Sequence, residues 1–303
     1  MSAGEGVAVL LVVRKFLKEI TLLRKVWFWI RFVKNNRYIP NFKNPKTYNE
    51  KINFRKRDPK NPLFSVCADK VKAKEYVAEK ISSQIIIPSY YVGDSIDVRQ
   101  VKAIIAEYGD CFLKANHNSG AVYLLTSSST ESEIQEAVDN VLEQLEYDFG
   151  HLVNEPWYSD IERKVLVEMR LSPSPGEVDI RDYKFHVFRQ SDGGFKIILE
   201  VHFDQNWNHN ISYFTEDLCW IPITIEYPNI VTQIEPPDNY ALMLEYARKL
   251  AEPFSYVRVD FYNLDGAIYF GELTFAKTSG AAVFMNRMYD LWLGNFWQGD
   301  PRF

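Results

Sequence analysis

The chain has 303 residues, 47% of them hydrophobic and 15% aromatic, and a formal net charge of -5. This composition excludes an intrinsically disordered protein and suffices for one large domain or two to three small ones. Three widely spaced cysteines favour reduced thiols in a cytosolic protein over a disulfide framework. The charge is divided unevenly, because residues 1–60 hold 15 Lys and Arg against 4 Asp and Glu, whereas the remainder is acidic.

The N-terminal segment contains no stretch long enough to span a bilayer. The apolar run 7–13 is followed by frequent charges, whereas a spanning helix requires about 20 apolar residues. Within residues 14–34, basic residues alternate with aromatic ones such as Trp27 and Phe32. This pattern is typical of an interfacial helix in peripheral contact with an anionic membrane face, and also of a helix whose aromatic residues pack on its own protein. The sequence leaves both interpretations open.

The next segments predict a mixed lobe. Residues 40–62 form an extended connector with a short helix over 48–54. Apolar spacing predicts helices over 69–81, 97–108 and 130–147, the last beginning with a capping box of Thr130 and Glu133. Short strands are expected at 85–87, 111–115 and 121–126, and a polar loop over 116–120 separates the last two.

The second half predicts mainly strands, at 164–169, 183–188 and 195–203, followed by a hairpin over 256–275. One helix, capped by Asp238, precedes the hairpin. We therefore predict an α+β fold: a basic helical leader and connector (1–63), a first lobe (64–165) and a sheet-dominated second lobe (166–303).

The hairpin carries acidic residues where a buried strand would carry apolar ones. A three-residue loop over 264–266 would place Arg258 opposite Glu272, with Asp260 diagonal to it. Alternation puts these three side chains and Thr274 on one face. Two carboxylates beside an arginine suit magnesium and a phosphoryl group, although a structural ion pair is the alternative.

Familiar nucleotide and hydrolase signatures are absent from the sequence: there is no Walker loop, G-x-G-x-x-G, G-x-S-x-G or His-Glu-x-x-His. What remains is a set of cations and carboxylates on consecutive strands. Lys114 precedes the polar loop, and Asp182, Lys184 and His186 share one strand face. Together with the hairpin, they predict a phosphate-binding site.

The order of several short motifs resembles that of the ATP-grasp superfamily, in particular the TupA-like ATP-grasp ligases of teichuronopeptide synthesis. The motifs are ADK (68–70), FLKANHNSG (112–120), VLVE (165–168), DYKFHVF (182–188), VRVDFY (257–262) and GELTF (271–275). The resemblance covers residues 40–295 approximately. It implies an ATP-grasp fold, with two α+β lobes and the nucleotide between them.

The resemblance also implies contacts to ATP. Lys70 and Lys114 would bind the nucleotide from the first lobe, Lys184 would be a second phosphate contact, and Arg258 would hold the transferred phosphoryl group. The other implied contacts are the loop residues His117, Asn118, Ser119 and Gly120 over the phosphates, and the hinge residues Glu168, Met169, Arg170 and Leu171 at adenine and ribose.

The same resemblance implies a magnesium site of one or two ions. Asp260 and Glu272 would be the metal ligands, with Thr274 where most ATP-grasp enzymes have Asn. A second departure from the family pattern is the segment 276–278, where a proline-containing turn is more common.

The implied reaction joins a carboxylate to an amine through an acyl phosphate made from ATP. The expected partners are ATP, a uronic-acid-containing glycan or precursor of bacterial surface polysaccharide, and a small amine such as an amino acid or amino alcohol, but no nucleic acid. The expected location is the cytoplasm, at the inner face of the cell membrane. A glycosyltransferase of the same pathway and a non-catalytic nucleotide-binding scaffold are the alternatives.

Overall fold

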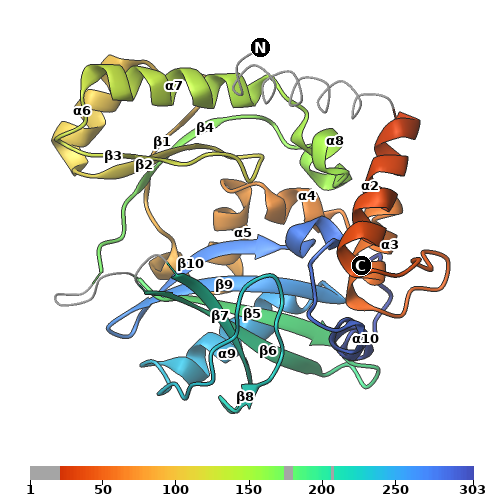
Figure 1. Ribbon diagram of the computed structural model, residues 1–303. Helices are drawn as coiled ribbons and strands as arrows, with labels where there is room; N and C mark the ends of the chain where they lie inside the picture. The colour runs from red at the N-terminus through yellow and green to blue at the C-terminus, as the bar shows by residue number, and fades with distance from the viewer. Residues whose placement is uncertain (1–20, 174–179, 206–207) are drawn as a thin grey trace.

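The computed structural model describes residues 21–173, 180–205 and 208–303, arranged in two lobes (Figure 1). A four-stranded sheet has the order β1-β4-β2-β3, and a six-stranded sheet has the order β10-β9-β5-β6-β7-β8. Every pairing between these strands is antiparallel. The predicted α+β class is confirmed.

The first lobe is built on the four-stranded sheet, and α6 and α7 cover its outer face (Figure 1). Its elements are β1 (Ser89–Gly93), α6 (Val98–Tyr108), β2 (Cys111–Ala115), β3 (Tyr123–Leu125), α7 (Glu131–Leu145) and β4 (Val165–Met169). The predicted capping box of Thr130 and Glu133 is present. The prediction of a strand at 85–87 was wrong: η1 (Ser83–Ile85) occupies its start, and Ile86 makes an isolated bridge to Phe270 of the six-stranded sheet.

The second lobe is built on the six-stranded sheet. Its elements are β5 (Asp182–Arg189), β6 (Phe195–Gln205), β7 (Asn208–Thr215), β8 (Trp220–Ile221), α9 (Tyr240–Ala251), β9 (Tyr256–Leu264), β10 (Ala267–Thr274), η3 (Lys277–Gly280) and α10 (Arg287–Phe296). The predicted cap at Asp238 was wrong, because Asn239 holds the N-cap position of α9 with a left-handed backbone (φ 62°). The elements β7, β8 and α10 were not among the predictions.

The segment predicted as a connector is part of the second lobe. It contains α3 (Tyr48–Arg57), and α4 (Leu63–Ala68) and α5 (Lys72–Lys80) follow it, the latter within the helix predicted over 69–81. Arg55 of α3 is fully buried and donates hydrogen bonds to the carbonyl oxygens of Tyr256 (2.9 Å) and Phe303 (3.0 Å). The helices α4 and α5 share the core of the large sheet, and β4 continues the first-lobe sheet to Met169. Packing therefore does not follow the boundaries expected at 63/64 and 165/166.

The helix α2 (Thr21–Asn36) has two different faces. Phe32 is buried against Tyr38 and Phe42, and Asn35 donates to the carbonyl of Ala281 at 2.9 Å. The opposite face exposes apolar residues: Leu23, Val26, Trp29 and Ile30. Among the residues that the structure covers, no helix has both the length and the apolar character needed to cross a membrane. The apolar run 7–13 and residues 14–20 of the expected interfacial segment lie outside the described residues.

Candidate nucleotide and metal site

The strands β9 and β10 bring the four predicted polar residues of the hairpin together. Arg258 donates from Nε to Asp260 Oδ1 and from Nη2 to Asp260 Oδ2, both at 2.7 Å, and from Nη2 to Glu272 Oε1 at 2.5 Å. Thr274 Oγ1 donates to Glu272 Oε1 at 2.8 Å. Burial would raise the pKa of Asp260, but the charges of Arg258 and Lys184 lower it below its usual value.

The register of this hairpin differs from the prediction. The loop has two residues, Asp265 and Gly266, both with positive φ (48° and 87°), rather than three. Such loops match the twist of paired strands. A register shift at Gly271 follows, so Asp260 lies directly opposite Glu272 rather than diagonal to it, and Arg258 lies opposite Thr274. The irregularity brings the two carboxylates closer than a regular ladder would.

The neighbouring strand β5 supplies a second cation. Lys184 lies opposite Asp260 and donates to its Oδ2 at 3.0 Å, and it also bonds Asp182. The Oδ1 atom of Asp182 is buried without a partner among the described residues. Burial and the nearby charge of Asp260 raise the pKa of Asp182. An acceptor left unpaired in this way is available to a ligand.

Two lysines, one from each lobe, share the carboxylate of Glu168 on β4. Lys114 of β2 donates to Glu168 Oε1 at 2.6 Å, and Lys74 of α5 pairs with the other oxygen of Glu168. Burial would raise the pKa of Glu168, but the two lysine charges lower it. Lys74 was not among the residues predicted from the sequence. It lies four residues after Lys70, and this spacing could have indicated a second lysine near the site. Lys70 itself bonds the carbonyl of Asn118, and burial lowers its pKa to about 8.

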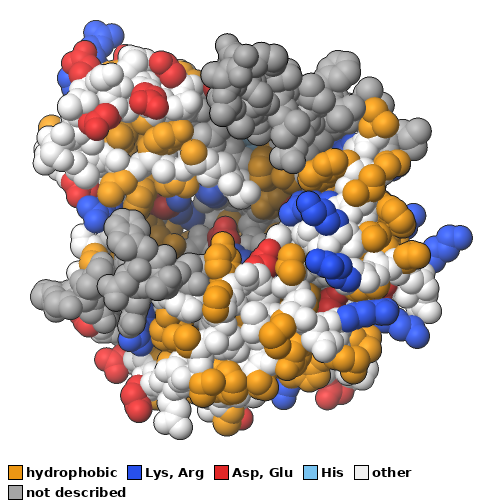
Figure 2. All heavy atoms as spheres, in the orientation of Figure 1, with side chains coloured by type: hydrophobic (Ala, Val, Ile, Leu, Met, Phe, Trp, Pro, Cys, Tyr) orange, Lys and Arg blue, Asp and Glu red, His pale blue; other side chains and the backbone are white. Residues whose placement is uncertain are grey.

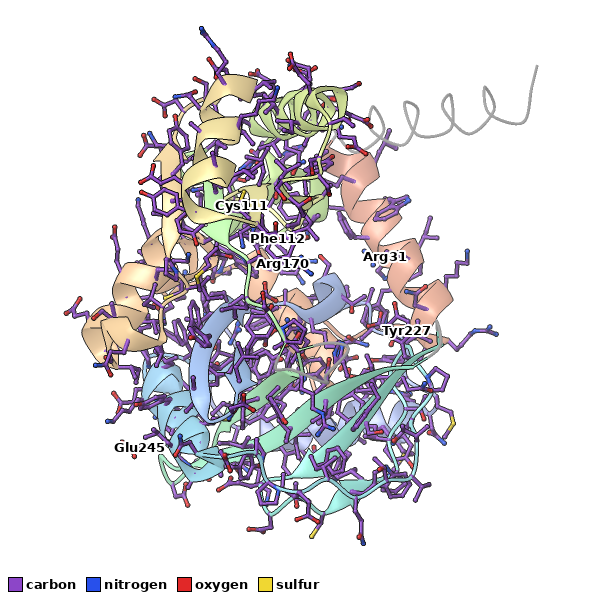
Figure 3. All side chains as sticks on the ribbon, turned by 90° about the vertical axis from the view of Figure 1, so that its left-hand side faces the viewer. Arg31, Cys111, Phe112, Arg170, Tyr227 and Glu245 are labelled. Carbon is purple, nitrogen blue, oxygen red and sulfur yellow. The ribbon has the colours of Figure 1, made fainter. Side chains whose placement is uncertain are left out.

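A cavity of about 400 Å³ lies between these groups. Figure 2 shows charged side chains in the hollow between the lobes, and Figure 3 labels Phe112 of β2 and Arg170, which directly follows β4, next to each other. The cavity wall includes Lys114 and the four expected hinge residues, together with apolar side chains suited to a base. The lining residues are Ile87, Phe112, Lys114, Val122, Leu124, Glu168, Met169, Arg170, Leu171, Pro173, Ile180, Tyr262 and Gly271.

None of the expected phosphate-loop residues 117–120 is among the residues that line the cavity. His117 is fully buried, with its Nε2 at 3.3 Å from the carbonyl oxygen of Tyr147, so its ring lies inside the first lobe. The side chain of Asn118 is also buried and donates to Gln144 at 2.9 Å. Only Ser119 and Gly120 are exposed. The composition of a loop shows which groups it carries, but not the direction in which each side chain points.

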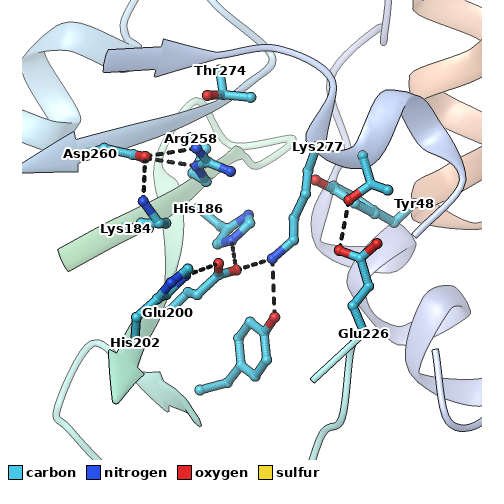
Figure 4. Close-up of polar contacts among 12 residues, drawn as sticks. Tyr48, Lys184, His186, Glu200, His202, Glu226, Arg258, Asp260, Thr274 and Lys277 are labelled. Carbon is cyan, nitrogen blue, oxygen red and sulfur yellow. Dashed lines mark hydrogen bonds and ion pairs between the residues drawn. The ribbon is translucent and has the colours of Figure 1, made fainter. Parts of the chain in front are cut away.

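A buried polar network continues the site across the sheet (Figure 4). Glu200 of β6 lies opposite Lys184, and it accepts hydrogen bonds from His186 Nε2 (2.9 Å) and His202 Nε2 (2.8 Å). Lys277 bonds the same carboxylate and Tyr213 Oη, the latter at 3.1 Å. Burial would raise the pKa of Glu200, but its partners hold it well below the usual value.

Sequence reasoning also missed this network. Its signal was a single acid, Glu200, within the otherwise apolar run 197–201 of the strand predicted at 195–203. Asp260 stands out on the same grounds. The sheet register now relates the two residues, because Glu272, Asp260, Lys184, Glu200 and Tyr213 are successive partners across five strands. One face of the sheet therefore carries a continuous polar row.

The sequence model of the TupA-like ATPgrasp family matches residues 50–298. Similar solved structures include D-alanyl-alanine synthetase A from Vibrio cholerae (15% identity, TM-score 0.47, covering 78% of this chain and 62% of that one). Another is the ATP-grasp ligase PsnB with minimal precursor, Mg and ADP (12% identity, TM-score 0.42, covering 78% of this chain and 59% of that one). The chain thus spans less than two thirds of the length of these proteins. No curated protein matches it in sequence.

Proposed function

Because the chain belongs to the TupA-like ATP-grasp family, we propose that it is an ATP-dependent carboxylate-amine ligase that requires Mg²⁺. The observation that carries this proposal is the pair of carboxylates, Asp260 and Glu272, held side by side with Arg258 and Lys184 next to the cavity between the lobes. A site with these charges suits phosphoryl transfer, in which catalysis depends mainly on position and on offsetting negative charge.

The donor set fits a magnesium ion that arrives with a nucleotide. Asp260, Glu272 and Thr274 offer oxygen atoms only, which Mg²⁺ prefers. Over the described ranges, no group of three or more His, Cys, Asp or Glu residues could hold a metal by itself. Nucleotide phosphates would therefore complete the coordination. The ion would supply positive charge to the phosphates during transfer.

The protein's own residues would position the reactants. Lys114 and Lys184 would bind ATP phosphates, and Arg258 would hold the transferred group bidentately. A carboxylate oxygen of the acid bonds to the γ-phosphorus while the bond to the ADP oxygen breaks. The amine nitrogen then bonds to the acyl carbon, phosphate leaves, and the nitrogen loses a proton. No protein nucleophile takes part.

We propose a uronic acid of a bacterial surface polysaccharide, or its precursor, as the acid, and an amino acid or amino alcohol as the amine. The resemblance of the sequence motifs supports this choice. The test is magnesium-dependent ADP release with uronic-acid glycans and a panel of amines, followed by mass spectrometry. ADP release that requires both partners, and a product lighter by one water than their sum, is the expected result.

The control for this test is Glu272→Gln, which removes one proposed ligand from a half-exposed position. The non-catalytic scaffold would be favoured if the wild type binds ATP but releases no ADP with any acid and amine. A glycosyltransferase would be favoured if the protein turns over a nucleotide sugar without ATP.

We also propose that the enzyme contacts the cytoplasmic face of the cell membrane through α2. The exposed face of this helix carries Leu23, Val26, Trp29 and Ile30, with 40% to 53% of each exposed. Exposed basic residues, Lys25, Lys34 and Arg37, lie on or next to the same helix. Apolar and indole side chains next to lysines suit an interface with anionic lipids.

Vesicle co-sedimentation tests this contact. Binding should require anionic lipid, weaken with salt, and be lost in a Val26→Glu, Ile30→Glu double variant. Val231→Glu is the control, because Val231 is 81% exposed on a second-lobe loop and its substitution adds the same kind of charge. Equal binding to neutral and anionic vesicles would contradict the proposal.

A further inference from the structure

The turn η3, directly after the strand that carries Glu272 and Thr274, has an unusual backbone. Thr278 (φ 48°, ψ 29°) and Ser279 (φ 56°, ψ 29°) are consecutive left-handed residues that are not glycine. This conformation is unfavourable for residues with a Cβ atom, and more so for a β-branched threonine. Such strain persists only where the surroundings hold it, and it occurs often at ligand sites.

Groups from distant parts of the chain hold this turn. Lys56 of α3 donates to the carbonyl oxygen of Ser279 at 2.8 Å, and Ser279 Oγ donates to Glu155 at 2.6 Å. Gly280 cannot be replaced without displacement, because a Cβ atom there would lie 2.5 Å from Asn53 Nδ2. Lys277 anchors the start of the turn through its bonds to Glu200 and Tyr213. Helix α3, the segment after α8 (Phe149–Val153) and the sheet thus fix one conformation.

The turn lies at the end of the site opposite the nucleotide cavity. Along β10, Gly271 lines the cavity, the proposed metal ligands Glu272 and Thr274 follow, and Lys277 begins the turn. In phosphoryl transfer the attacking and leaving oxygens lie roughly in line on opposite sides of the phosphorus. If ADP leaves toward the cavity, the carboxylate must approach from the side of the turn.

The polar groups exposed at this end suit a hydroxylated acid. Thr278 Oγ1 donates to Glu226 Oε2 at 2.7 Å, which is the bond drawn at Glu226 in Figure 4. Glu226 is exposed. Figure 3 labels Arg31 of α2 near Tyr227, the chain neighbour of Glu226. Burial lowers the pKa of Arg31, and the nearby charges of Glu226 and Glu155 offset part of this lowering. A hydroxyl, a carboxylate and a guanidinium offer both donors and acceptors to sugar hydroxyl groups.

We propose that Thr278, Glu226 and Arg31 form the subsite for the acid substrate, and that this substrate is a polyhydroxylated acid of the uronic type. The subsite rests on the proposed ligase function. Thr278 and Glu226 contact hydroxyl groups of the sugar ring, and Arg31 contacts a further anionic or hydroxyl group. Lys277 and Glu200 are positioning residues, because they hold the turn and not the substrate.

Calorimetric titration tests the subsite in the presence of Mg²⁺ and a non-hydrolysable ATP analogue. The probes are glucuronic, galacturonic and mannuronic acids, with cyclohexanecarboxylic acid as a carboxylate without hydroxyl groups. Thr278→Val and Glu226→Gln should each weaken binding of the preferred uronic acid about tenfold, which corresponds to one lost hydrogen bond to a charged group. The affinity for the ATP analogue and for the control acid should not change.

Thr126→Val, in the first lobe, is the matched control and should leave every affinity unchanged. If Thr278→Val disturbs the turn, Glu226→Gln still tests the subsite, because Glu226 is exposed and its substitution should leave the fold intact. Changes below twofold in both variants would overturn the subsite. So would a wild type that binds none of the three uronic acids but releases ADP with another acid. Failure of ADP release with every acid would instead count against the ligase function.

Discussion

Arg258 donates its Nε and Nη2 atoms to the two oxygens of Asp260, so a guanidinium already neutralises a proposed metal ligand. The same guanidinium reaches Glu272 at 2.5 Å. A divalent cation at these carboxylates must therefore compete with Arg258. ATP phosphates give the guanidinium another anion to bind, which favours metal and nucleotide binding together.

If Arg258 competes with the metal ion for the two carboxylates, removing Arg258 should strengthen metal binding in the absence of nucleotide. Arg258→Gln should bind Mn²⁺ about tenfold more tightly than the wild type, because removing one positive charge lessens repulsion of the ion. Electron paramagnetic resonance measures the free Mn²⁺. Arg170→Gln removes a cavity arginine paired with Asp110 and should have no effect. Equal or weaker Mn²⁺ binding by Arg258→Gln would refute the competition.

The two proposed metal ligands should differ in their effect on stability. Asp260 is 2% exposed and is the carboxylate that Arg258 and Lys184 share, so Asp260→Asn removes one counter-charge from each of two buried cations and should cost about 3 kcal/mol. Glu272 is half exposed and Arg258 keeps its two bonds to Asp260 without it, so Glu272→Gln should change stability by less than about 0.5 kcal/mol. Both should abolish turnover. Urea unfolding measures the difference, and equal losses would contradict it.

The two lysines on Glu168 should act redundantly. Lys74→Met or Lys114→Met alone leaves the carboxylate one cation and should cost about 1 kcal/mol or less. The double variant leaves Glu168 buried without a partner lysine and should cost about 3 kcal/mol. Urea unfolding of the four proteins measures this coupling. Additive losses would show that the lysines act independently.

The burial of His186 should make the stability of the protein depend on pH. Burial lowers its pKa from 6.5 to about 4. Between these values the unfolded chain binds a proton and the native protein does not, so stability falls as pH decreases from 6.5 to 4, by about 3 kcal/mol in total. His186→Gln should remove this part of the pH dependence, as measured by urea unfolding at several pH values. An identical slope in both proteins would mean that His186 titrates normally.

From the sequence it was possible to predict which side chains share the face of the sheet at the site, but not which of them contact each other. Alternation placed Arg258, Asp260 and Glu272 together, since side-chain direction in a strand has a period of two. The register was not predictable, because the shift at Gly271 depends on packing between strands. The pairing of Lys277 with Glu200, 77 residues apart, has no local signal.

The role of α3 was hidden for a different reason. Its buried residues include Asn49, Glu50, Arg55 and Lys56, which are polar and are typical of a solvated connector. Their hydrogen-bond partners lie more than 200 residues away in several cases, such as Asp290 for Asn49 and Ser279 for Lys56. Composition indicates burial only for apolar residues.

The burial of Arg55 has a consequence for the order of assembly during synthesis. Its partners are the carbonyl oxygens of Tyr256, Phe275, Pro301 and Phe303, all of which leave the ribosome after more than 200 further residues have been added. Until then α3 lacks the groups that satisfy its guanidinium, while the first-lobe strands, which lie within residues 89–169, can already pair with one another. Domains generally form as units in the order in which they are made. Here the lobe whose helices are made first is completed last.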